Sequence, residues 1–330
     1  MEKGGVKKGA PLEKSGRVPV FSPPFPMGKA TREAYGETLV QLGREDERIV
    51  VLDADLSKST MTRLFAKEFP ERFFNFGIAE ANMVSAAAGF AASGRIPFVS
   101  SFACFLTCKG YDQMRVSVAL PGFPVKFVSS HGGISVGEDG PSQQSIEDIA
   151  LMCSLPKMVV IVPADEVETA EAVRAVVRYP GPTYIRTGRP KAPKIYSGEC
   201  PFQIGKYLRL KEGNDLTIFA NGLLVAEALK AAQELEKEGI LARVVDSATV
   251  KPPDTEEILK ACEETQAVLV CEEHQIYGGL GSIIAREVSR LHPVPVDFIA
   301  ILDTYAESGK PEELFDRYGL SARHIVQKAK

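Results

Sequence analysis

The sequence predicts an α/β protein of two domains, each a mostly parallel sheet flanked by helices. Three observations predict this class. Short apolar runs alternate with helical patterns along most of the chain, several of these runs are continuously apolar, and a stretch rich in Gly, Pro and Lys interrupts the alternation. Continuous apolar strands between helices are typical of parallel sheets buried on both faces. A length of 330 residues suits two such domains.

The first domain is expected over residues 28–190, after an N-terminal arm at residues 1–27 that is rich in Lys, Gly and Pro. Apolar residues at helical spacing, or alanine-rich runs, indicate its helices, and short apolar runs indicate its strands. The expected helices are residues 31–42, 80–92 and 167–177. The expected strands are residues 49–52, 97–99, 125–128, 158–162 and 183–186.

The second domain is expected over residues 214–330, after a linker at residues 191–213 in which Gly, Pro and Lys break the pattern. The same signals repeat after the linker, so the same kind of sheet is expected again. The expected strands are residues 216–220, 242–246, 267–271 and 296–299. The expected helices are residues 223–238, 255–263 and 280–290, followed by two short helices.

Composition excludes several classes of protein. Hydrophobic residues make up 45% and charged residues 25%, which is too apolar for extensive disorder. Lys plus Arg is 39 and Asp plus Glu is 43, so the net charge of −4 predicts neither a nucleic-acid partner nor an anionic membrane surface. Because no apolar run reaches the roughly 20 residues of a membrane helix, and the polar start lacks the apolar core of a secretory signal, we expect a cytoplasmic protein.

Cysteines and histidines are too few and too scattered to predict a metal site in this chain. The six cysteines form no C-x-x-C pair, and there are four histidines. Cys104 and Cys108 are spaced to share a helical face, but no further Cys or His completes a ligand set. Reduced thiols are therefore expected.

Three segments carry residues that suit a functional site. Residues 76–83 place Glu80 at a helix start, where a carboxylate is by itself usually a partner of the helix dipole. Phe102 and Phe105 lie three apart, which is by itself typical of core packing. Residues 130–144 form a long glycine-rich stretch with His131 and Asp139, and loops of this length are commonly functional. The P-loop, Rossmann and serine-hydrolase elbow motifs are not present as such.

Taken together, these segments resemble the transketolase family. The match consists of Asp-Ala-Asp-Leu-Ser at residues 53–57, Gly-Ile-Ala-Glu ending at Glu80, Ser-Ser-Phe-Ala-Cys-Phe at residues 100–105, and His131 followed by Asp-Gly-Pro at 139–141. Each motif is short, but their joint order and spacing are specific. The resemblance covers about residues 28–330 and corresponds to the pyrimidine-binding and C-terminal domains of that family.

The resemblance implies a site for the pyrimidine end of thiamine diphosphate. Glu80 matches the catalytic glutamate that hydrogen-bonds the aminopyrimidine ring. Phe102 and Phe105 match aromatic residues that pack around this ring. Leu56 matches the bulky residue that supports the bent cofactor, and Asp55 matches an acidic residue near the cofactor and the subunit interface.

The resemblance also implies a site for sugar phosphates. Arg32, Ser59 and Arg186 match positions that hold the phosphate, and guanidinium groups suit a phosphate dianion. Each arginine alone is equally compatible with an ordinary surface position. His131 and Asp139 match residues that contact the sugar hydroxyls, and an imidazole there can steer proton transfers, so His131 is also a catalytic candidate.

Three positions depart from the family pattern. Gln143 stands where the family often has histidine, so the substrate contact expected at Gln143 cannot titrate. Ala79 stands before the glutamate where arginine is common, and Cys108 replaces a tyrosine of the ring pocket. The first departure leaves the substrate preference open, and the last leaves a smaller wall on the ring pocket.

The largest departure is that the sequence contains no Gly-Asp-Gly, the motif with which the family binds the cofactor diphosphate through Mg²⁺. We therefore expect one subunit of a split transketolase. A separate N-terminal subunit would hold the diphosphate and its Mg²⁺ or Ca²⁺, and a homodimer of this chain would form part of an α2β2 complex. The expected reaction moves a two-carbon ketol unit from xylulose 5-phosphate to ribose 5-phosphate, in the pentose phosphate pathway. The alternatives are the β subunit of a 2-oxoacid dehydrogenase decarboxylase and a non-catalytic regulatory paralogue.

Overall fold

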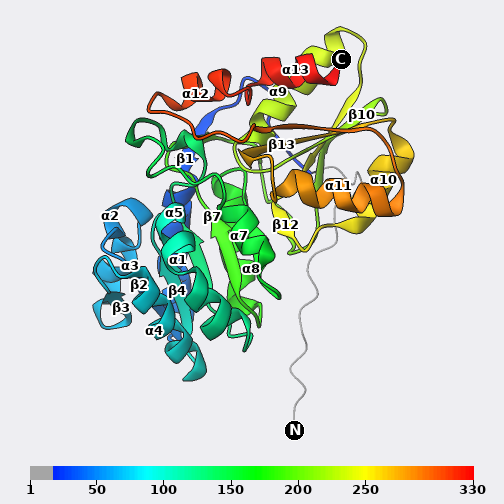
Figure 1. Ribbon diagram of the computed structural model, residues 1–330. Helices are drawn as coiled ribbons and strands as arrows, with labels where there is room; N and C mark the ends of the chain where they lie inside the picture. Colours follow the sequence, from blue (N-terminus) through cyan, green and yellow to red (C-terminus); the bar gives the residue numbers. More distant parts are fainter. Residues whose placement is uncertain (1–17) are drawn as a thin grey trace.

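The computed structural model describes residues 18–330 (Figure 1). The first half of this range contributes six strands to a seven-stranded sheet, and the seventh strand, β12, comes from the second half. The strand order of this sheet is β12-β6-β7-β5-β4-β2-β3. Every neighbouring pair is parallel except β12 with β6. The strands from this half are β2 (Ile49–Asp53), β3 (Phe73–Asn75), β4 (Ile96–Ser100), β5 (Lys126–Ser129), β6 (Val159–Ile161) and β7 (Thr183–Arg186).

Successive side chains along each strand point to opposite faces of the sheet, so the first half has two apolar layers. Val51 points into one layer, with residues of α1, α3 and α8, whereas Val50 and Leu52 point into the other, with residues of α4, α5 and α7. Both faces of the sheet are thus covered, as the continuous apolar runs predict. The helices are α1 (Thr31–Glu45), α2 (Ser57–Thr60), α3 (Arg63–Glu68), η1 (Pro70–Arg72), α4 (Glu80–Ala92), α5 (Ala103–Lys109), α6 (Tyr111–Gln113), η2 (Met114–Ala119), η3 (Ile134–Asp139), α7 (Asp148–Ser154) and α8 (Glu166–Arg178).

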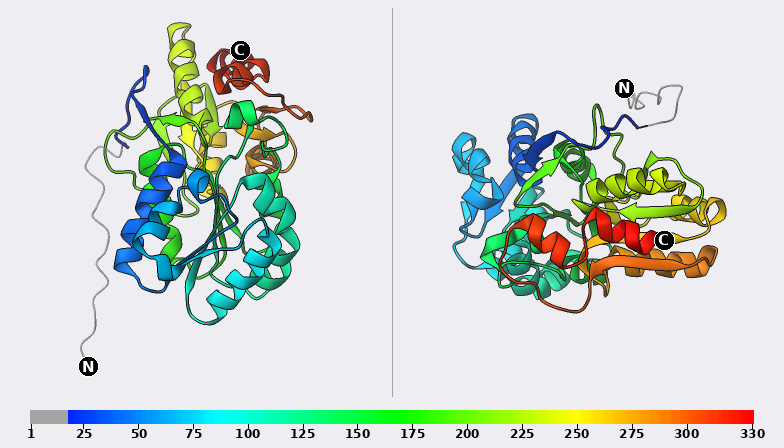
Figure 2. Two further views of the ribbon diagram at one scale, coloured as in Figure 1. Left: turned by 90° about the vertical axis from the view of Figure 1, so that its left-hand side faces the viewer. Right: turned by 90° about the horizontal axis from the view of Figure 1, so that it is seen from above.

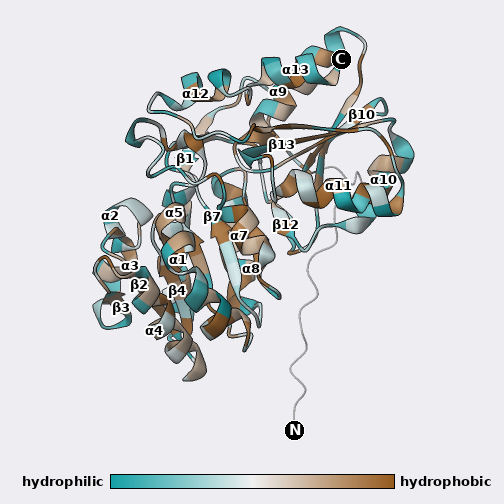
Figure 3. Cartoon of the chain, viewed as in Figure 1, coloured by the Kyte–Doolittle hydropathy of each residue, from teal (hydrophilic) through white to brown (hydrophobic). Residues whose placement is uncertain are grey.

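The second half forms a five-stranded sheet in the order β14-β13-β10-β11-β9, parallel except at β9. Helices α9 and α13 cover one face, and α10 and α11 cover the other. Figure 3 shows the apolar strands at the centre with more polar helix surfaces outside. The strands are β9 (Leu208–Lys211), β10 (Leu216–Ala220), β11 (Ala242–Asp246), β13 (Val268–Gln275) and β14 (Val296–Ile301). The helices are α9 (Leu224–Lys237), α10 (Thr255–Glu264), α11 (Leu280–Leu291), α12 (Pro311–Arg317) and α13 (Ala322–Ala329).

The two halves lie side by side, and the second half adds one strand to the sheet of the first half (Figure 2). Strand β12 (Thr249–Lys251), which follows β11 in the chain, pairs with β6 and completes the edge of the first sheet. Strands β1 (Met27–Ala30) and β8 (Lys191–Pro193) form a separate antiparallel ribbon. The predicted two-domain α/β fold with mostly parallel sheets is confirmed. The segment predicted as a linker contains β8 and β9, and of the predicted N-terminal arm, residues 1–17 lie outside the described residues.

A cluster of buried acids also joins the halves. The hydroxyl of Tyr196 donates to Asp246 Oδ2 at the end of β11, at 2.7 Å, and lies 3.4 Å from Glu168 Oε1 on α8. Asp165 caps α8 through the backbone N–H groups of residues 167 and 168, and it also accepts from the backbone N–H of residues 195 and 196. Three carboxylates and one hydroxyl therefore fix the connecting segment between the sheets.

Within residues 18–330, no helix combines the length and the apolar character that crossing a bilayer requires.

Candidate active site

Glu80 lies in the first turn of α4, with its side chain only 2% exposed. The turn before it contains Gly77 with φ +66°, a conformation that favours glycine. Glu80 Oε1 accepts a hydrogen bond from Ser101 Oγ at 3.2 Å, and Oε2 lies 3.6 Å from Lys109 Nζ. Because Ser101 directly follows β4, the carboxylate is held at the carboxyl edge of the sheet, where ligands of α/β proteins bind.

Two phenylalanine rings lie beside this carboxylate. Phe102 precedes α5 and Phe105 lies in its first turn; their rings stack with centroids 5.5 Å apart. The Phe102 ring also stacks on the His131 imidazole at 3.8 Å. Lys109 Nζ lies 4.5 Å from the centroid of the Phe105 ring. The structure thus brings Glu80, Phe102, Phe105 and His131 together, as the sequence motifs predict.

His131 is held in a fixed and neutral state. It follows β5 with φ +59°, its side chain is buried, and its Nδ1 lies 2.8 Å from Ser130 Oγ. Burial, together with the positive charges of Arg32 and Arg189, lowers the pKa of His131 to about 3. The imidazole is therefore uncharged at physiological pH, and Nε2 is the nitrogen left for a ligand.

Arg32 and Ser59 lie together at the start of α1 and in α2. Arg32 Nη1 donates to the backbone oxygen of Ser59 at 2.9 Å, and the buried Arg32 Nε has no hydrogen-bond partner within the described residues. Burial lowers the pKa of Arg32. A partly buried arginine side chain with an unpaired N–H donor suits an anionic ligand.

Asp53, which the sequence reasoning overlooked, organises the turn that carries Asp55, Leu56 and Ser59. Its carboxylate accepts from the Leu56 backbone N–H at 2.7 Å and from the hydroxyls of Thr60 and Thr62 at 2.7 and 2.8 Å. Burial raises the pKa of Asp53 despite these hydrogen bonds. The available signal was an aspartate at the end of an apolar strand, followed by two threonines.

Asp55 lies at the exposed side of this turn with φ +65°. Its backbone N–H donates to Asn75 Oδ1 at 3.1 Å, and its carboxylate accepts from Asn75 Nδ2 at 3.3 Å. Leu56 is half-buried beside it. These contacts fix the two residues at the end of β2, next to β3.

Asp139 lies at the end of η3, within reach of an arginine that the sequence reasoning missed. Arg189 Nη1 donates to Glu138 Oε2 at 2.7 Å and to the backbone oxygen of Val136 at 2.5 Å, and its Nη2 lies 3.9 Å from Asp139 Oδ1. The positive charge of Arg189 also contributes to the lowered pKa of His131. Gln143 accepts through Oε1 from the Ser142 hydroxyl. The signal for Arg189 was a second arginine three residues after Arg186.

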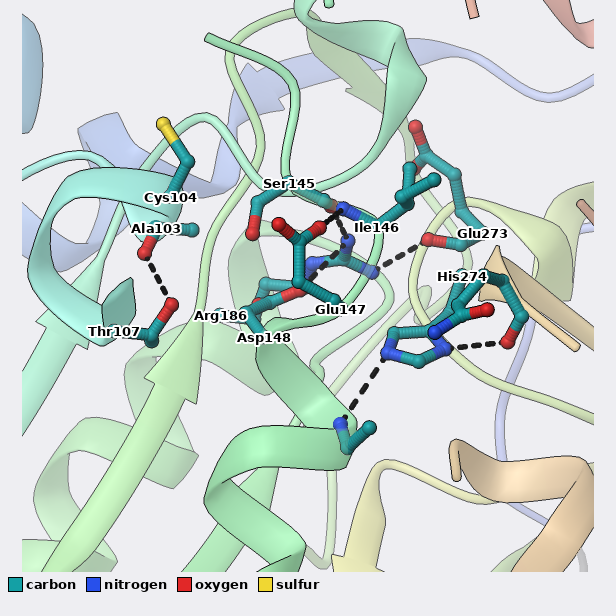
Figure 4. A network of polar contacts seen from close by, with 12 residues as sticks. Ala103, Cys104, Thr107, Ser145, Ile146, Glu147, Asp148, Arg186, Glu273 and His274 are labelled. Atoms are coloured by element: carbon teal, nitrogen blue, oxygen red, sulfur yellow. Dashed lines mark hydrogen bonds and ion pairs between the residues drawn. The ribbon is translucent and has the colours of Figure 1, made fainter. Parts of the chain in front are cut away.

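Arg186 packs against Gly132, the residue after His131, and takes part in a polar network between the two halves (Figure 4). It is 4% exposed; its Nη2 donates to the backbone oxygen of Ser145 at 2.6 Å and lies 3.2 Å from Asp148 Oδ1. Its Nη1 donates to the backbone oxygen of Glu273 on β13 at 2.8 Å. Both Nη atoms are therefore committed to protein oxygens. These contacts link the two halves, whereas the buried Nε has no hydrogen-bond partner within the described residues, as at Arg32. The phosphate contact expected of Arg186 stays a prediction.

His274 is a second link in the same region (Figure 4). The backbone N–H of Ala150 on α7 donates to His274 Nε2 at 3.3 Å, and His274 Nδ1 lies 2.6 Å from the backbone oxygen of Gln275. These contacts make Nε2 the acceptor and Nδ1 the donor. The carboxyl end of β13 thus serves the contact between the halves.

Within residues 18–330, no group of three or more His, Cys, Asp or Glu side chains is arranged so that it could hold a metal ion. The whole sequence also lacks Gly-Asp-Gly. The Glu80 carboxylate beside aromatic rings fits a flat heterocycle with a hydrogen-bonding edge. A diphosphate with its metal needs several converging oxygen ligands, which these residues do not offer.

Comparison with known protein families matches residues 27–194 to the description "Transketolase, pyrimidine binding domain" and residues 205–325 to "Transketolase, C-terminal domain". The chain is 46% identical over 303 residues to a putative transketolase C-terminal section of Methanocaldococcus jannaschii, covering 91% of this chain and 95% of that protein. It is 40% identical to the 6-deoxy-6-sulfo-D-fructose transketolase subunit SqwH of Clostridium sp. (strain MSTE9), covering 90% and 92%.

A solved structure with the same fold is described as a split gene transketolase in the form of an inactive β4 tetramer. It shares 48% sequence identity, the TM-score is 0.86, and the match covers 92% of this chain and 97% of that one.

Proposed function

The chain belongs to the transketolase family, of which it contains the pyrimidine-binding and C-terminal domains, and we propose that it is one subunit of a split, thiamine-diphosphate-dependent transketolase. The observation that carries this proposal is the buried Glu80 carboxylate, which Lys109 connects to the Phe105 ring and through it to Phe102. The reaction proposed is transfer of a two-carbon ketol unit between sugar phosphates, such as xylulose 5-phosphate and ribose 5-phosphate, in the pentose phosphate pathway.

Each residue of the cluster has a defined task. Glu80 shares a proton with the ring nitrogen of the aminopyrimidine, and its burial keeps water from competing for that hydrogen bond. Phe102 and Phe105 hold the ring by stacking. Asp55 and Leu56 support the cofactor from the turn at the end of β2. When bound, thiamine diphosphate supplies the ring that accepts the electrons of the cleaved carbon–carbon bond.

The sugar phosphate is bound from the other side of the cluster. Arg32 and Arg189 provide two guanidinium groups for the phosphate, with Ser59 beside Arg32. Neutral His131 presents Nε2 to a sugar oxygen, where it can donate or accept a proton as its tautomer allows. Asp139 and Gln143 complete the contacts to sugar hydroxyls. We propose Arg189 as a further phosphate ligand beside Arg32, and Arg186, whose Nε is unpaired, remains a candidate for the same role.

The proposal requires a partner. A separate N-terminal subunit with Gly-Asp-Gly would hold the diphosphate and Mg²⁺ or Ca²⁺, and two copies of this chain would join two partner subunits as an α2β2 complex in the cytoplasm. The name of the solved relative, a split gene transketolase whose β4 tetramer is inactive, supports a dependence on the partner. So does the correspondence of this chain to nearly the full length of a C-terminal section.

The experiment is reconstitution of ketol transfer from separately purified subunits. The chain alone should be inactive with thiamine diphosphate and Mg²⁺, and addition of the partner should restore activity. Glu80→Gln in the reconstituted complex should abolish it, whereas Glu312→Gln, also in the first turn of a helix but exposed, should not. Full activity of the chain alone, or undiminished activity of the Glu80→Gln complex, would refute the proposal.

Donor specificity needs its own comparison, because one relative is named for a sulfonated sugar. Two arginines suit a phosphate and a sulfonate alike. Xylulose 5-phosphate and 6-deoxy-6-sulfo-D-fructose should therefore be tested as donors in parallel, with a neutral ketose as the control. The phosphate proposal predicts the highest kcat/KM for xylulose 5-phosphate.

A further inference from the structure

Lys109, the last residue of α5, meets two parts of the proposed cofactor site at once. Its Nζ lies 3.6 Å from Glu80 Oε2 and 4.5 Å from the centroid of the Phe105 ring. The lysine side chain is 49% exposed, whereas that of Glu80 is 2% exposed. A flexible, half-exposed cation thus reaches from the surface to the buried carboxylate.

These contacts are of the same kind as those that the proposed function assigns to the aminopyrimidine. The ring would place a hydrogen-bonding edge on Glu80 and a face on the phenylalanine rings. Lys109 places an ammonium near Glu80 and against Phe105, which is a favourable cation–π arrangement. Because both ligands use the Glu80 carboxylate and the Phe105 ring, they compete.

The free subunit has a physical reason to need such a cation. A carboxylate buried beside aromatic rings is costly when it lacks partners. The Ser101 hydroxyl supplies one hydrogen bond, to Oε1, and Lys109 is the cation nearest to Oε2 in an ion pair. Without cofactor, the ammonium therefore compensates the charge of Glu80.

We propose that Lys109 is a built-in substitute for the pyrimidine ring, occupying Glu80 and Phe105 in the cofactor-free subunit and swinging into solvent when the cofactor binds. This inference rests on the proposed function, since it takes Glu80 and Phe105 as pyrimidine ligands. Four rotatable methylene links and half-exposure permit the movement without a change of backbone. Cofactor binding must then break one ion pair and one cation–π contact.

Removal of the lysine charge should therefore strengthen cofactor binding and weaken the free subunit. In Lys109→Met, which keeps most of the apolar stem, the affinity for thiamine diphosphate should rise about three- to tenfold, the range for a half-exposed ion pair with a cation–π contact. The melting temperature of the chain alone should fall by about 1–3 °C, because Glu80 loses its cation. Lys109→Arg should resemble the wild type in both measurements.

The test is isothermal titration calorimetry of thiamine diphosphate with Mg²⁺ into the two-subunit complex, together with thermal unfolding of this chain alone. Lys260→Met, at an exposed lysine of α10, is the matched control. In a Glu80→Gln background the Lys109→Met substitution should change neither quantity, because a neutral amide attracts the ammonium weakly.

The outcomes separate the two proposals. Tighter binding by Lys109→Met, lost in the Glu80→Gln background, supports the substitute role. Unchanged or weaker binding overturns it, because Lys109 then remains in place beside the bound cofactor. If neither the wild-type nor the Lys109→Met complex binds thiamine diphosphate, the proposed function fails, and this inference fails with it.

Discussion

The stability of the chain should fall as the pH rises toward neutral, and replacement of Asp246 by asparagine should remove most of this fall. Asp246 and Glu168 are both buried, and both lie within reach of the Tyr196 hydroxyl, which is 2.7 Å from Asp246 Oδ2 and 3.4 Å from Glu168 Oε1. A further acid, Asp165, lies close enough to raise the pKa of both carboxyls. Burial and mutual repulsion therefore favour the protonated forms of this pair.

The expected magnitude follows from the pKa of Asp246. Burial raises it from 3.8 to about 7, and burial with the Asp246 charge raises the pKa of Glu168 well above its usual value. Between about pH 4 and 7 the folded chain therefore binds more protons than the unfolded chain, and stability falls as pH rises through this window. A difference of about three pH units corresponds to about 4 kcal/mol. That equals a loss of roughly 6 °C in melting temperature for a chain of this size.

The assay is the melting temperature from pH 5 to pH 8, followed by calorimetry. In Asp246→Asn the amide stays neutral and accepts from Tyr196, so the decline should shrink to less than half that of the wild type. In the double variant Glu168→Gln/Asp246→Asn it should vanish. Glu263→Gln, at an exposed acid of α10, should behave as the wild type. Parallel curves for the wild type and Asp246→Asn would refute the raised pKa of Asp246.

Three further outcomes follow from the site. Arg186→Met should lower the free energy of unfolding by about 3–5 kcal/mol, because it leaves the Asp148 carboxylate buried and unpaired; adding Asp148→Asn should restore part of the loss in a denaturant titration. Arg189→Met in the two-subunit complex should raise KM for a phosphorylated ketose about ten- to a hundredfold, the range for charge-assisted hydrogen bonds, with little change for an unphosphorylated one. An NMR titration should show His131 neutral from pH 5 to pH 9, since its pKa is about 3; a midpoint near 6.5 would contradict the described burial.

The most accurate predictions from the sequence concern helices and strands that a local apolar pattern determines. The ranges 216–220 and 242–246, expected as strands, agree with β10 and β11 because each is a short, mainly apolar run with β-branched residues, and all of its residues are buried. Strand β12 was missed because three residues carry no periodicity and their partner, β6, lies far away in the chain. Pairing between remote segments is set by tertiary packing, which a local pattern does not contain.

In the candidate site too, local motifs identified some residues, and only the fold identified others. The motifs identified Glu80, Phe102, Phe105 and His131, which the fold brings together at the carboxyl edge of the first sheet. Sequence alone could not predict the different contacts of Arg186 and Arg189, because only the fold brings Asp148 and β13 against the first arginine and Glu138 against the second. Likewise, nothing local indicates that Lys109 reaches Glu80.

The pairing of β12 with β6 means that the two halves are not modules that can be separated or exchanged. A chain cut after β8 would present the edge of β6, a buried apolar strand, to solvent, and such edges promote aggregation. A chimera that borrows the C-terminal half of a relative therefore has to carry residues 249–251 in a form that fits the recipient's first sheet. The two sheets therefore have to be kept together, as one unit, in any engineered variant.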